Sequence, residues 1–284
     1  MDSTKHAPPA WFITGCSTGL GRALAQSVLR HGHRCVVTAR DETRIADIVK
    51  PYPNTALAVA LDVTDEQQRE SSVVRAEEIF GGIDVLVNNA GHGYLAAVEE
   101  GEEDRIREMF ETNFFALAAL VRRVLPGMRA RGHGHILNIS SVGGLIGNPG
   151  SGYYSASKFA VEGLSQALAK EVTPLGIRVT VIEPGPFRTD FHGRSMITTR
   201  NSIGAYAATA GARRAQLGKS SGQQPGDPVR AADAIIKVVE AQTAPRHLIL
   251  GKSGVERMRE ALHAHLRSID EWEGVSLAAD YPEA

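Results

Sequence analysis

The sequence is poor in the features that mark several classes of protein. Its 284 residues include only two cysteines, Cys16 and Cys35, which lie in different predicted elements. We therefore expect neither a disulfide framework nor a cysteine-based metal site. The charges balance, with 31 Lys and Arg against 32 Asp and Glu and a formal net charge of −1. Because there is no basic excess to gather nucleic acid or an anionic membrane, small molecules are the expected partners.

Long apolar runs are missing as well. The longest, Phe114 to Val121, is far shorter than the roughly 20 residues of a membrane-spanning helix. The first residues contain Asp2 and prolines where a signal peptide would have an apolar block, so we expect a cytoplasmic protein. No repeat and no Pro/Gly/Ser-rich linker divides the chain. Its 43% hydrophobic and 22% charged residues are typical of one globular unit.

Short apolar runs alternate with longer stretches of helical periodicity. The runs are predicted as seven strands, several of them apolar throughout, as expected where both faces of a sheet are covered. The predicted strands are Trp11–Thr14, Arg34–Thr38, Leu57–Asp62, Val85–Asn88, His135–Ser140, Val179–Glu183 and His247–Leu250. The predicted helices between them are Leu20–Leu29, Glu66–Phe80, Arg105–Met128, Ser155–Leu175 and Val229–Gln242. This order predicts an α/β fold with a doubly wound, Rossmann-like parallel sheet and helices on both faces.

The pattern also divides the chain into parts. We predict a flexible tail at residues 1–10, one catalytic domain at 11–251, and a C-terminal helix near Val255–Ile269 with an acidic tail within 252–284. Residues 190–227 lose regular periodicity and are too long for a plain connection, which predicts a substrate lid. A solvated insertion without function is the alternative. The arginines of this segment either stay in solvent or attract an acidic substrate, and we favour an apolar substrate.

A glycine-rich loop follows the first predicted strand and opens the first predicted helix. It reads Thr14-Gly15-Cys16-Ser17-Thr18-Gly19-Leu20-Gly21. Glycines there let a pyrophosphate approach backbone N–H groups at a helix N-terminus, where the helix dipole favours negative charge. Such a loop alone can be a tight turn without a ligand. The strand before it and the helix after it favour a dinucleotide.

Tyr154 and Lys158 are four residues apart at the start of a predicted helix, so both side chains project from the same face. An ammonium close to a phenol favours the phenolate and lowers the pKa of the tyrosine, which makes the pair a tunable acid/base. Without the glycine-rich loop, two exposed helix residues would be the more common meaning of this spacing. Tyr153 lies one residue earlier and faces Ser157 instead.

Together these blocks make the chain resemble the short-chain dehydrogenase/reductase family, in its short single-domain branch. The resemblance covers about residues 11–251. After the glycine-rich loop, its further blocks are Leu61-Asp62-Val63, Asn88-Asn89-Ala90-Gly91, Asn113, Ser140-Ser141, Tyr154 with Lys158, and Pro184-Gly185. The resemblance implies an NADP(H)-dependent oxidoreductase that interconverts a carbonyl and an alcohol by hydride transfer, with Tyr154 as general acid/base. A sugar-nucleotide epimerase or dehydratase and a non-catalytic dinucleotide-sensing regulator are the alternatives.

The resemblance also implies roles for single residues. Ser141 would hydrogen-bond the substrate oxygen, Lys158 would tune Tyr154 and bind ribose, and Asn113 would hold a water that relays protons. Strand alternation turns Ser140 away from Ser141. The substrate contacts are Ser141, His92 and Phe191. The cofactor contacts are Gly15, Ser17, Thr18, Gly19, Leu20, Gly21, Arg40, Asp62, Val63, Asn89, Ala90, Gly91, Tyr154, Lys158, Pro184, Gly185, Phe187 and Thr189.

Two further expectations concern assembly and metals. The resemblance implies a homodimer or homotetramer that pairs through the helices around Arg105–Met128 and Ser155–Leu175. The histidines form three pairs two residues apart, but no carboxylate or cysteine accompanies them at ligand spacing. We therefore expect no metal site.

The choice between cofactors depends on the end of the second predicted strand, Val37-Thr38-Ala39-Arg40-Asp41. Relatives that use NAD place an acidic residue there, which binds the ribose 2′-hydroxyl and would repel a 2′-phosphate. The matching position here is Ala39, and the Arg40 guanidinium suits a phosphate, so NADP(H) is favoured. NAD(H) is the alternative, because a shift of two residues in the strand end would place Asp41 at that position.

Overall fold

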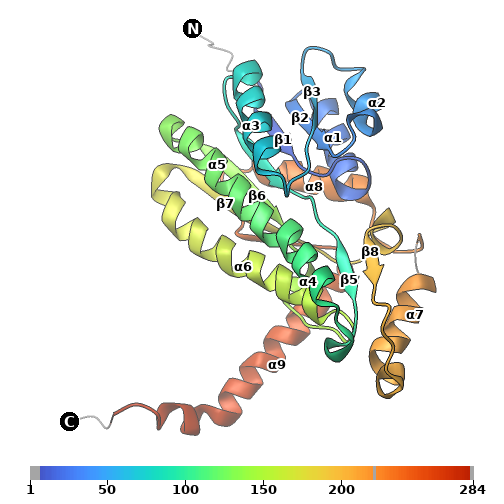
Figure 1. The fold of residues 1–284 in the computed structure, drawn as a ribbon. Coiled ribbons are helices and arrows are strands. Elements are labelled where there is room, and N and C mark those ends of the chain that lie inside the picture. Colours follow the sequence, from blue (N-terminus) through green and yellow to red (C-terminus); the bar gives the residue numbers. More distant parts are fainter. Residues whose placement is uncertain (1–6, 220–221, 282–284) are drawn as a thin grey trace.

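The protein is built around one seven-stranded sheet (Figure 1). The computed structural model describes residues 7–219 and 222–281, so residues 1–6 of the predicted tail, 220–221 of the predicted lid and the last three residues lie outside the described chain. The strands lie in the order β3-β2-β1-β4-β6-β7-β9, and every pair is parallel. Their bounds are β1 Ala10–Ile13, β2 Arg34–Ala39, β3 Ala56–Ala60, β4 Val85–Asn88, β6 Gly134–Ile139, β7 Ile177–Pro184 and β9 His247–Leu250. The predicted doubly wound sheet is confirmed.

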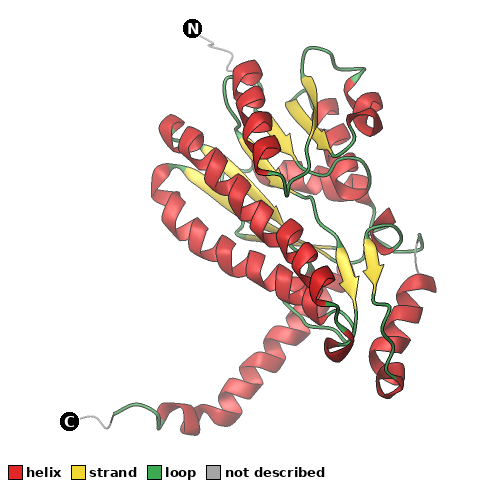
Figure 2. Cartoon of the chain, viewed as in Figure 1, coloured by secondary structure: helices red, strands yellow, loops and turns green. Residues whose placement is uncertain are grey.

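Alternation along the strands divides the core into two layers. Trp11 and Ile13 pack on one side of the sheet, and Phe12 between them packs on the other. The first layer lies under α1 (Gly19–Arg30), α2 (Ala46–Val49) and α8 (Pro228–Glu240), and the second under α3 (Glu66–Phe80), α5 (Ala116–Arg131) and α6 (Gly152–Val172) (Figure 2). Helices on both faces explain why the strands are apolar throughout.

The strand order places the functional crevice. The chain runs from β1 outward to β3, then returns to the other side of β1 with β4. At such a reversal the loops after neighbouring strands diverge and leave a crevice at their carboxyl ends. The glycine-rich loop after β1 and the Asn89–Gly91 segment after β4 therefore meet there.

Three parts of the chain differ from the predictions. The predicted helix Arg105–Met128 is α4 (Glu103–Phe110), a π-helical turn (Glu111–Phe115) and α5, because one wide turn barely disturbs the apolar periodicity. A second, two-stranded parallel sheet joins β5 (Gly93–Leu95) to β8 (Met196–Thr198) of the predicted lid, which also carries the short helix α7 (Ala212–Lys219). Ala10 is buried in β1 and does not belong to the tail.

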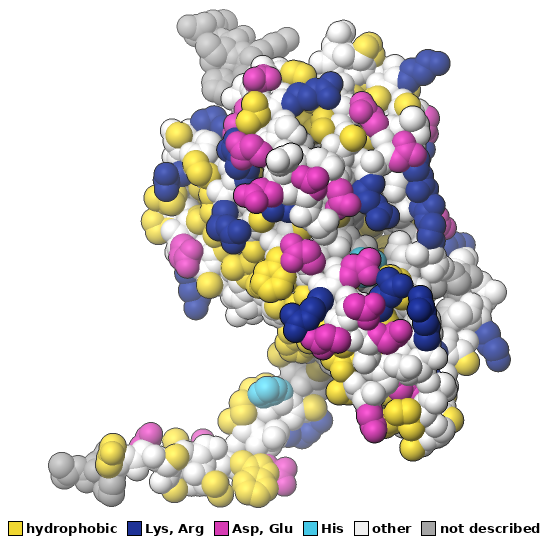
Figure 3. All heavy atoms as spheres, viewed as in Figure 1, with side chains coloured by type: hydrophobic (Ala, Val, Ile, Leu, Met, Phe, Trp, Pro, Cys, Tyr) yellow, Lys and Arg dark blue, Asp and Glu magenta, His cyan; other side chains and the backbone are white. Residues whose placement is uncertain are grey.

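The C-terminal helix α9 (Lys252–Leu277) is longer than predicted and extends away from the rest of the chain (Figures 1 and 3). No proline interrupts the sequence between these bounds, and Gly254 is its only buried residue. Its exposed apolar side chains are Leu262, Leu266, Ile269, Trp272, Val275 and Leu277. None of the described helices is long and apolar enough to cross a membrane.

Candidate active site

A cleft of about 720 Å³ lies at the carboxyl ends of the strands. Every predicted site residue lines it except Gly21 and Asn113. A side chain at Gly21 would collide with the Asn89 amide and the Gly15 carbonyl oxygen, so this glycine permits close packing of α1 below the loop. Asn113 is fully buried behind the cleft wall. The fold thus gathers residues from seven separate sequence blocks around one space.

The glycine-rich loop has the geometry of an anion cradle. Gly15 and Gly19 adopt φ values of +72° and +62°, which glycine reaches without strain. Thr18 is the N-cap of α1, yet its side chain caps none of the first N–H groups, and the first turn has no acidic residue. Thr189 faces Gly19, since a Cβ there would lie 3.6 Å from the Thr189 Cβ. These free N–H groups at a helix N-terminus fit the pyrophosphate of a dinucleotide.

One end of the cleft is basic. Arg40 follows β2, and Arg44, which the sequence analysis missed, lines the same end. Asp41 accepts hydrogen bonds from Thr43 N at 3.0 Å and Thr43 Oγ1 at 2.6 Å, and it does not line the cleft. Its carboxylate therefore caps a local turn. The Asp62 carboxylate also caps a local turn, because it accepts a hydrogen bond from Thr64 N at 3.0 Å.

Tyr154 and Ser141 lie together in the middle of the cleft. Ser141 follows β6, and Gly143 keeps the space beside it open, because a Cβ at Gly143 would lie 3.3 Å from Tyr154 Cε1 and 3.4 Å from Ser141 Oγ. The Phe191 ring lies 5.9 Å from the Tyr154 ring, centroid to centroid. Tyr153 points away from this group and donates its hydroxyl proton to the Val98 carbonyl at 2.6 Å.

The pKa of Tyr154 differs from the one that its spacing from Lys158 predicts. Burial raises the pKa of Tyr154 to about 12, and a hydrogen bond with Ser141 opposes the shift only in part. Burial also lowers the pKa of Lys158 to about 8, against the opposing influence of the Glu162 carboxylate. The expected lowering of the tyrosine pKa is absent because desolvation of the phenol outweighs its polar contacts. Tyr154 is a protonated acid in this state of the protein.

Lys158, Asn113 and His92 surround Gly91. A Cβ at Gly91 would lie 3.0 Å from Asn113 Oδ1 and 3.6 Å from Lys158 Nζ. Lys158 Nζ donates to the Ile139 carbonyl at 2.8 Å. Asn113, within the π-helical turn, donates to the His92 carbonyl at 2.9 Å and accepts from His92 N at 3.0 Å. The asparagine thus fixes the backbone of His92, and burial lowers the pKa of the His92 imidazole.

A group of two buried carboxylates and one exposed histidine near Lys158 was missed by the sequence analysis. Glu162 of α6, Glu183 of β7 and His247 of β9 place ligand-type atoms within 4.8 Å of one another. The His247 Nδ1 atom lies 2.7 Å from Glu183 Oε1 and 3.7 Å from Glu162 Oε2. Burial raises the pKa of Glu162 to about 7 and also raises that of Glu183. The residues come from three distant segments, so no spacing reveals them.

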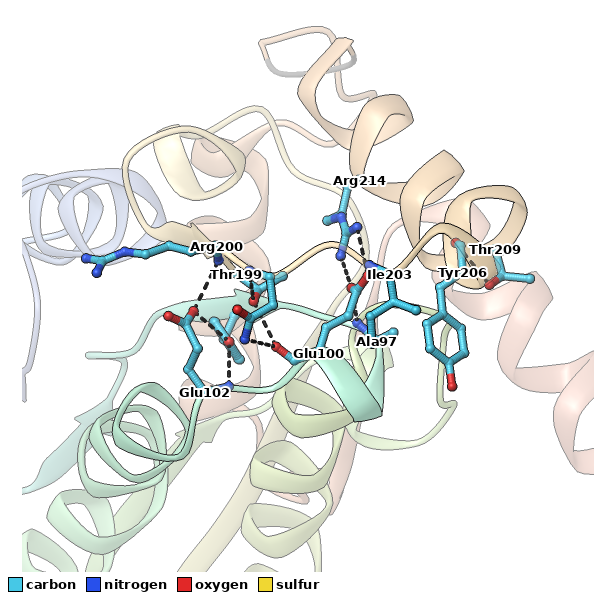
Figure 4. A network of polar contacts seen from close by, with 11 residues as sticks. Ala97, Glu100, Glu102, Thr199, Arg200, Ile203, Tyr206, Thr209 and Arg214 are labelled. Carbon is cyan, nitrogen blue, oxygen red and sulfur yellow. Dashed lines mark hydrogen bonds and ion pairs between the residues drawn. The ribbon is translucent and has the colours of Figure 1, made fainter.

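The predicted lid forms one wall of the cleft. Its residues Phe191, Met196, Ile197 and Leu217 line the space, and Phe187 just before the lid does so too. A polar network fastens the lid to the segment after β5 (Figure 4). In it, Arg214 pairs with the buried Glu100. The sequence analysis missed this anchor and the cleft residue Arg257, and it left open whether the lid arginines face solvent; Arg194 and Arg213 line the cleft.

Comparison with known proteins is consistent with this geometry. A family model described as short chain dehydrogenase matches residues 10–198. The chain belongs to the short-chain dehydrogenase family. It is 40% identical over 270 residues to "Oxidoreductase BOA17" of Botryotinia fuckeliana, covering 95% of this chain and 98% of that protein. As a member of this family it is an NAD(P)-dependent dehydrogenase or reductase.

Two further proteins are similar to this short-chain dehydrogenase over most of their length. A "3-ketodihydrosphingosine reductase" of Bacteroides thetaiotaomicron is 35% identical over 240 residues, covering 84% of this chain and 86% of that protein. The crystal structure of a short-chain dehydrogenase from Streptomyces avermitilis matches with a TM-score of 0.90 and 40% identity, covering 96% of this chain and all of that one. The different names leave the substrate of this short-chain dehydrogenase open.

Proposed function

We propose that the protein is an NADP(H)-dependent oxidoreductase that interconverts a carbonyl and an alcohol, with Tyr154 as the general acid/base. The observation that carries this proposal is the position of the Tyr154 side chain, which lies beside Ser141 at the cleft and one helical turn before Lys158. A regulator that only sensed a dinucleotide would have no need of such a group. Among the described residues, the chain after β9 forms the single helix α9, which is too small for the substrate domain that an epimerase would use.

The chain's own residues account for the proton step. The bound dinucleotide would supply or accept the hydride. Tyr154, protonated because its pKa is about 12, donates its proton to the carbonyl oxygen, while the Ser141 hydroxyl holds that oxygen in place. Lys158 is cationic below a pH of about 8 and favours the phenolate that remains. In the reverse direction the same phenolate accepts the proton of the alcohol.

The preference for NADP(H) is supported by the charges at the basic end of the cleft. Arg40 and Arg44 both line it, and the position that would hold an acid in an NAD-binding site is Ala39. NAD(H) was the alternative because Asp41 could bind the ribose 2′-hydroxyl. The Asp41 carboxylate instead accepts hydrogen bonds from Thr43. Guanidinium groups at this end of the cleft suit a 2′-phosphate.

Assembly and location complete the proposal. Phe115 and Phe159 are 53% and 46% exposed, and they lie on the helices through which the family resemblance implies pairing. We propose that a second copy covers them in a homodimer or homotetramer, which light scattering measures. A cytoplasmic location stays a prediction; it agrees with the free thiols of Cys16 and Cys35.

A substrate panel tests the proposed reaction. Aldehydes and ketones are offered with NADPH and with NADH, and primary and secondary alcohols with the oxidised forms, while nicotinamide absorbance is followed. We expect turnover of at least one carbonyl with a higher kcat/KM for NADPH than for NADH. Tight NADPH binding without turnover of any compound would favour the sensing regulator. Nucleotide sugars are assayed separately by product analysis, because an epimerase regenerates its nicotinamide and leaves the absorbance unchanged; turnover of these compounds alone would favour the epimerase.

A further inference from the structure

Two arginines that line the cleft have no carboxylate within ion-pair distance among the described residues. Arg213 comes from α7 of the lid, Arg257 comes from α9, and both line the same space as Tyr154. Among the described residues neither forms an ion pair. The Nε atom of Arg213 is buried with no hydrogen-bond partner in the described chain. Burial lowers the pKa of Arg213, and the neighbouring charge of Arg257 lowers it further.

Arg257 is bonded to the loop that leads into the catalytic helix, and the lid segment before Arg213 packs on the same loop. Arg257 Nη2 donates to Asn148 Oδ1 at 2.7 Å. Gly150 of this loop packs on Ala210, since a Cβ at Gly150 would lie 3.3 Å from the Ala210 backbone, and Arg213 follows Ala210 by three residues. Ser151 ends the loop three residues before Tyr154 and also lines the cleft. The contacts of this loop therefore place the two arginines on the side of the cleft that leads to Tyr154.

The other cleft arginines have different places. Arg40 and Arg44 belong to the end next to β2. The Arg194 Nη2 atom lies 3.4 Å from Thr18 Oγ1, at the glycine-rich loop. A dinucleotide held by these three residues leaves Arg213 and Arg257 to the substrate. The apolar side chains of Phe191, Met196, Ile197 and Leu217 line the same space.

We propose that Arg213 and Arg257 bind an anionic group, a carboxylate or a phosphate, at the far end of a substrate whose body is apolar. Two guanidinium groups in one partly buried space repel each other, and an anion between them removes that cost while filling their unused N–H donors. Arg213 and Arg257 therefore attract an acidic substrate, and the apolar side chains of the cleft hold the rest of it. This inference rests on the proposed function only for the reaction at the opposite end of that substrate.

Selectivity for paired substrates tests the inference. A series of ω-oxo carboxylic acids of increasing chain length is compared with their methyl esters and with the matching ω-oxoalkyl phosphates. We expect at least one acid or phosphate to exceed the neutral ester of the same length in kcat/KM by about 10- to 100-fold, the scale of a charge-assisted contact. The acid and phosphate arms show which anion is preferred.

Variants show which residues cause the preference for the anionic substrate over its ester. Arg213→Gln and Arg257→Gln each reduce the anion-to-ester ratio about tenfold or more. Arg257→Lys keeps the charge and retains part of the ratio, which separates charge loss from misfolding. The matched control is Arg259→Gln, which removes an exposed arginine of the same helix outside the cleft and leaves the ratio unchanged. Parent ratios near one at every chain length, or ratios equal in all variants, would overturn the inference.

A binding measurement separates this inference from the proposed reaction. If the protein turns over no carbonyl or alcohol of the panel, the proposed function fails, and calorimetry with adipate against dimethyl adipate then decides on the arginine pair. We expect adipate to bind the parent and Arg259→Gln, and to bind Arg213→Gln and Arg257→Gln at least tenfold more weakly. Absence of adipate binding to the parent, or equal binding by all four proteins, would contradict the pair as an anion site.

Discussion

Glu100 and Arg214 join the segment after β5 to the lid through an ion pair in which the Glu100 side chain is fully buried (Figure 4). The carboxylate also accepts from Ala97 N at 3.0 Å and from Ile203 N at 2.9 Å. The guanidinium of Arg214 and these N–H donors lower the pKa of Glu100 to about 2, so the residue stays ionised at any working pH. One charged side chain thus fastens the lid at two points.

Replacing this carboxylate should loosen the lid. In Glu100→Gln the partly buried Arg214 loses its counter-charge, so we expect faster hydrogen exchange over residues 196–217 and a raised KM. The control is Glu103→Gln, which removes an exposed carboxylate nearby. Exchange rates in Glu100→Gln that match both the parent and the control would show that this pair does not hold the lid.

The lid should respond to ligands. We predict that residues 190–227 are mobile without ligand and gain protection when NADPH and a substrate analogue are bound, because the described lid residues form much of one cleft wall. Hydrogen exchange with and without both ligands measures this. Equal protection in the two states would rule out gating, whatever the strength of the Glu100 anchor.

The choice of cofactor should depend on Arg40. Arg40→Asp replaces a phosphate contact by like-charge repulsion, so we expect NADPH to lose much more affinity than NADH, by about tenfold or more. Fluorescence titration with both cofactors gives the ratio. Arg75→Asp on the exposed side of α3 makes the same charge change away from the cleft and serves as control. A parent that prefers NADH, or equal losses for both cofactors, contradicts the assignment.

Stability should depend on pH through Glu162. Burial raises its pKa from the ordinary 4.5 to about 7, so the folded state holds a proton that the unfolded state releases. Stability contributed by the protonated carboxyl is therefore present at low pH and lost as pH rises between these two values. Glu162→Gln mimics the neutral form, and its Tm should fall less than that of the parent from about pH 5 to pH 8.

The control for this measurement is Glu171→Gln, an exposed position on the same helix. Glu183, His247 and Lys158 face Glu162 and remain in both proteins. Parallel Tm curves for the parent and Glu162→Gln would show that Glu162 is ionised in the folded protein throughout this range.

The sequence predicted the sheet and the residues nearest the glycine-rich loop because their signals are local. Apolar runs such as Val85–Asn88 identify strands, and the interval from Tyr154 to Lys158 places two groups on one helix face without knowledge of the fold. Ser140 and Ser141 diverge as strand alternation requires, since Ser140 lies beside Glu162 and Ser141 beside Tyr154.

Contacts between residues far apart in the sequence could not be predicted from local patterns. Arg257 enters the cleft from a helix that was predicted to begin near it, but nothing in the spacing links it to Arg213. Glu100 lies outside every periodic pattern, and its role depends on a lid residue 114 positions later. The pKa of Tyr154 was predicted in the wrong direction because the charge of a neighbour can be read from spacing, whereas the extent of burial requires the fold.

Tyr154 carries the central claim, and Tyr153 is its natural control. We predict that Tyr154→Phe retains NADPH binding and loses kcat by about 10²- to 10⁴-fold, because the proton donor is gone while the ring and its packing on Phe191 remain. Tyr153→Phe, which loses only a hydrogen bond to the Val98 carbonyl outside the cleft, keeps near-parent kcat. The kcat values of the three proteins on one carbonyl at saturating NADPH decide the matter, and a Tyr154→Phe protein that turns over like the parent would contradict the account.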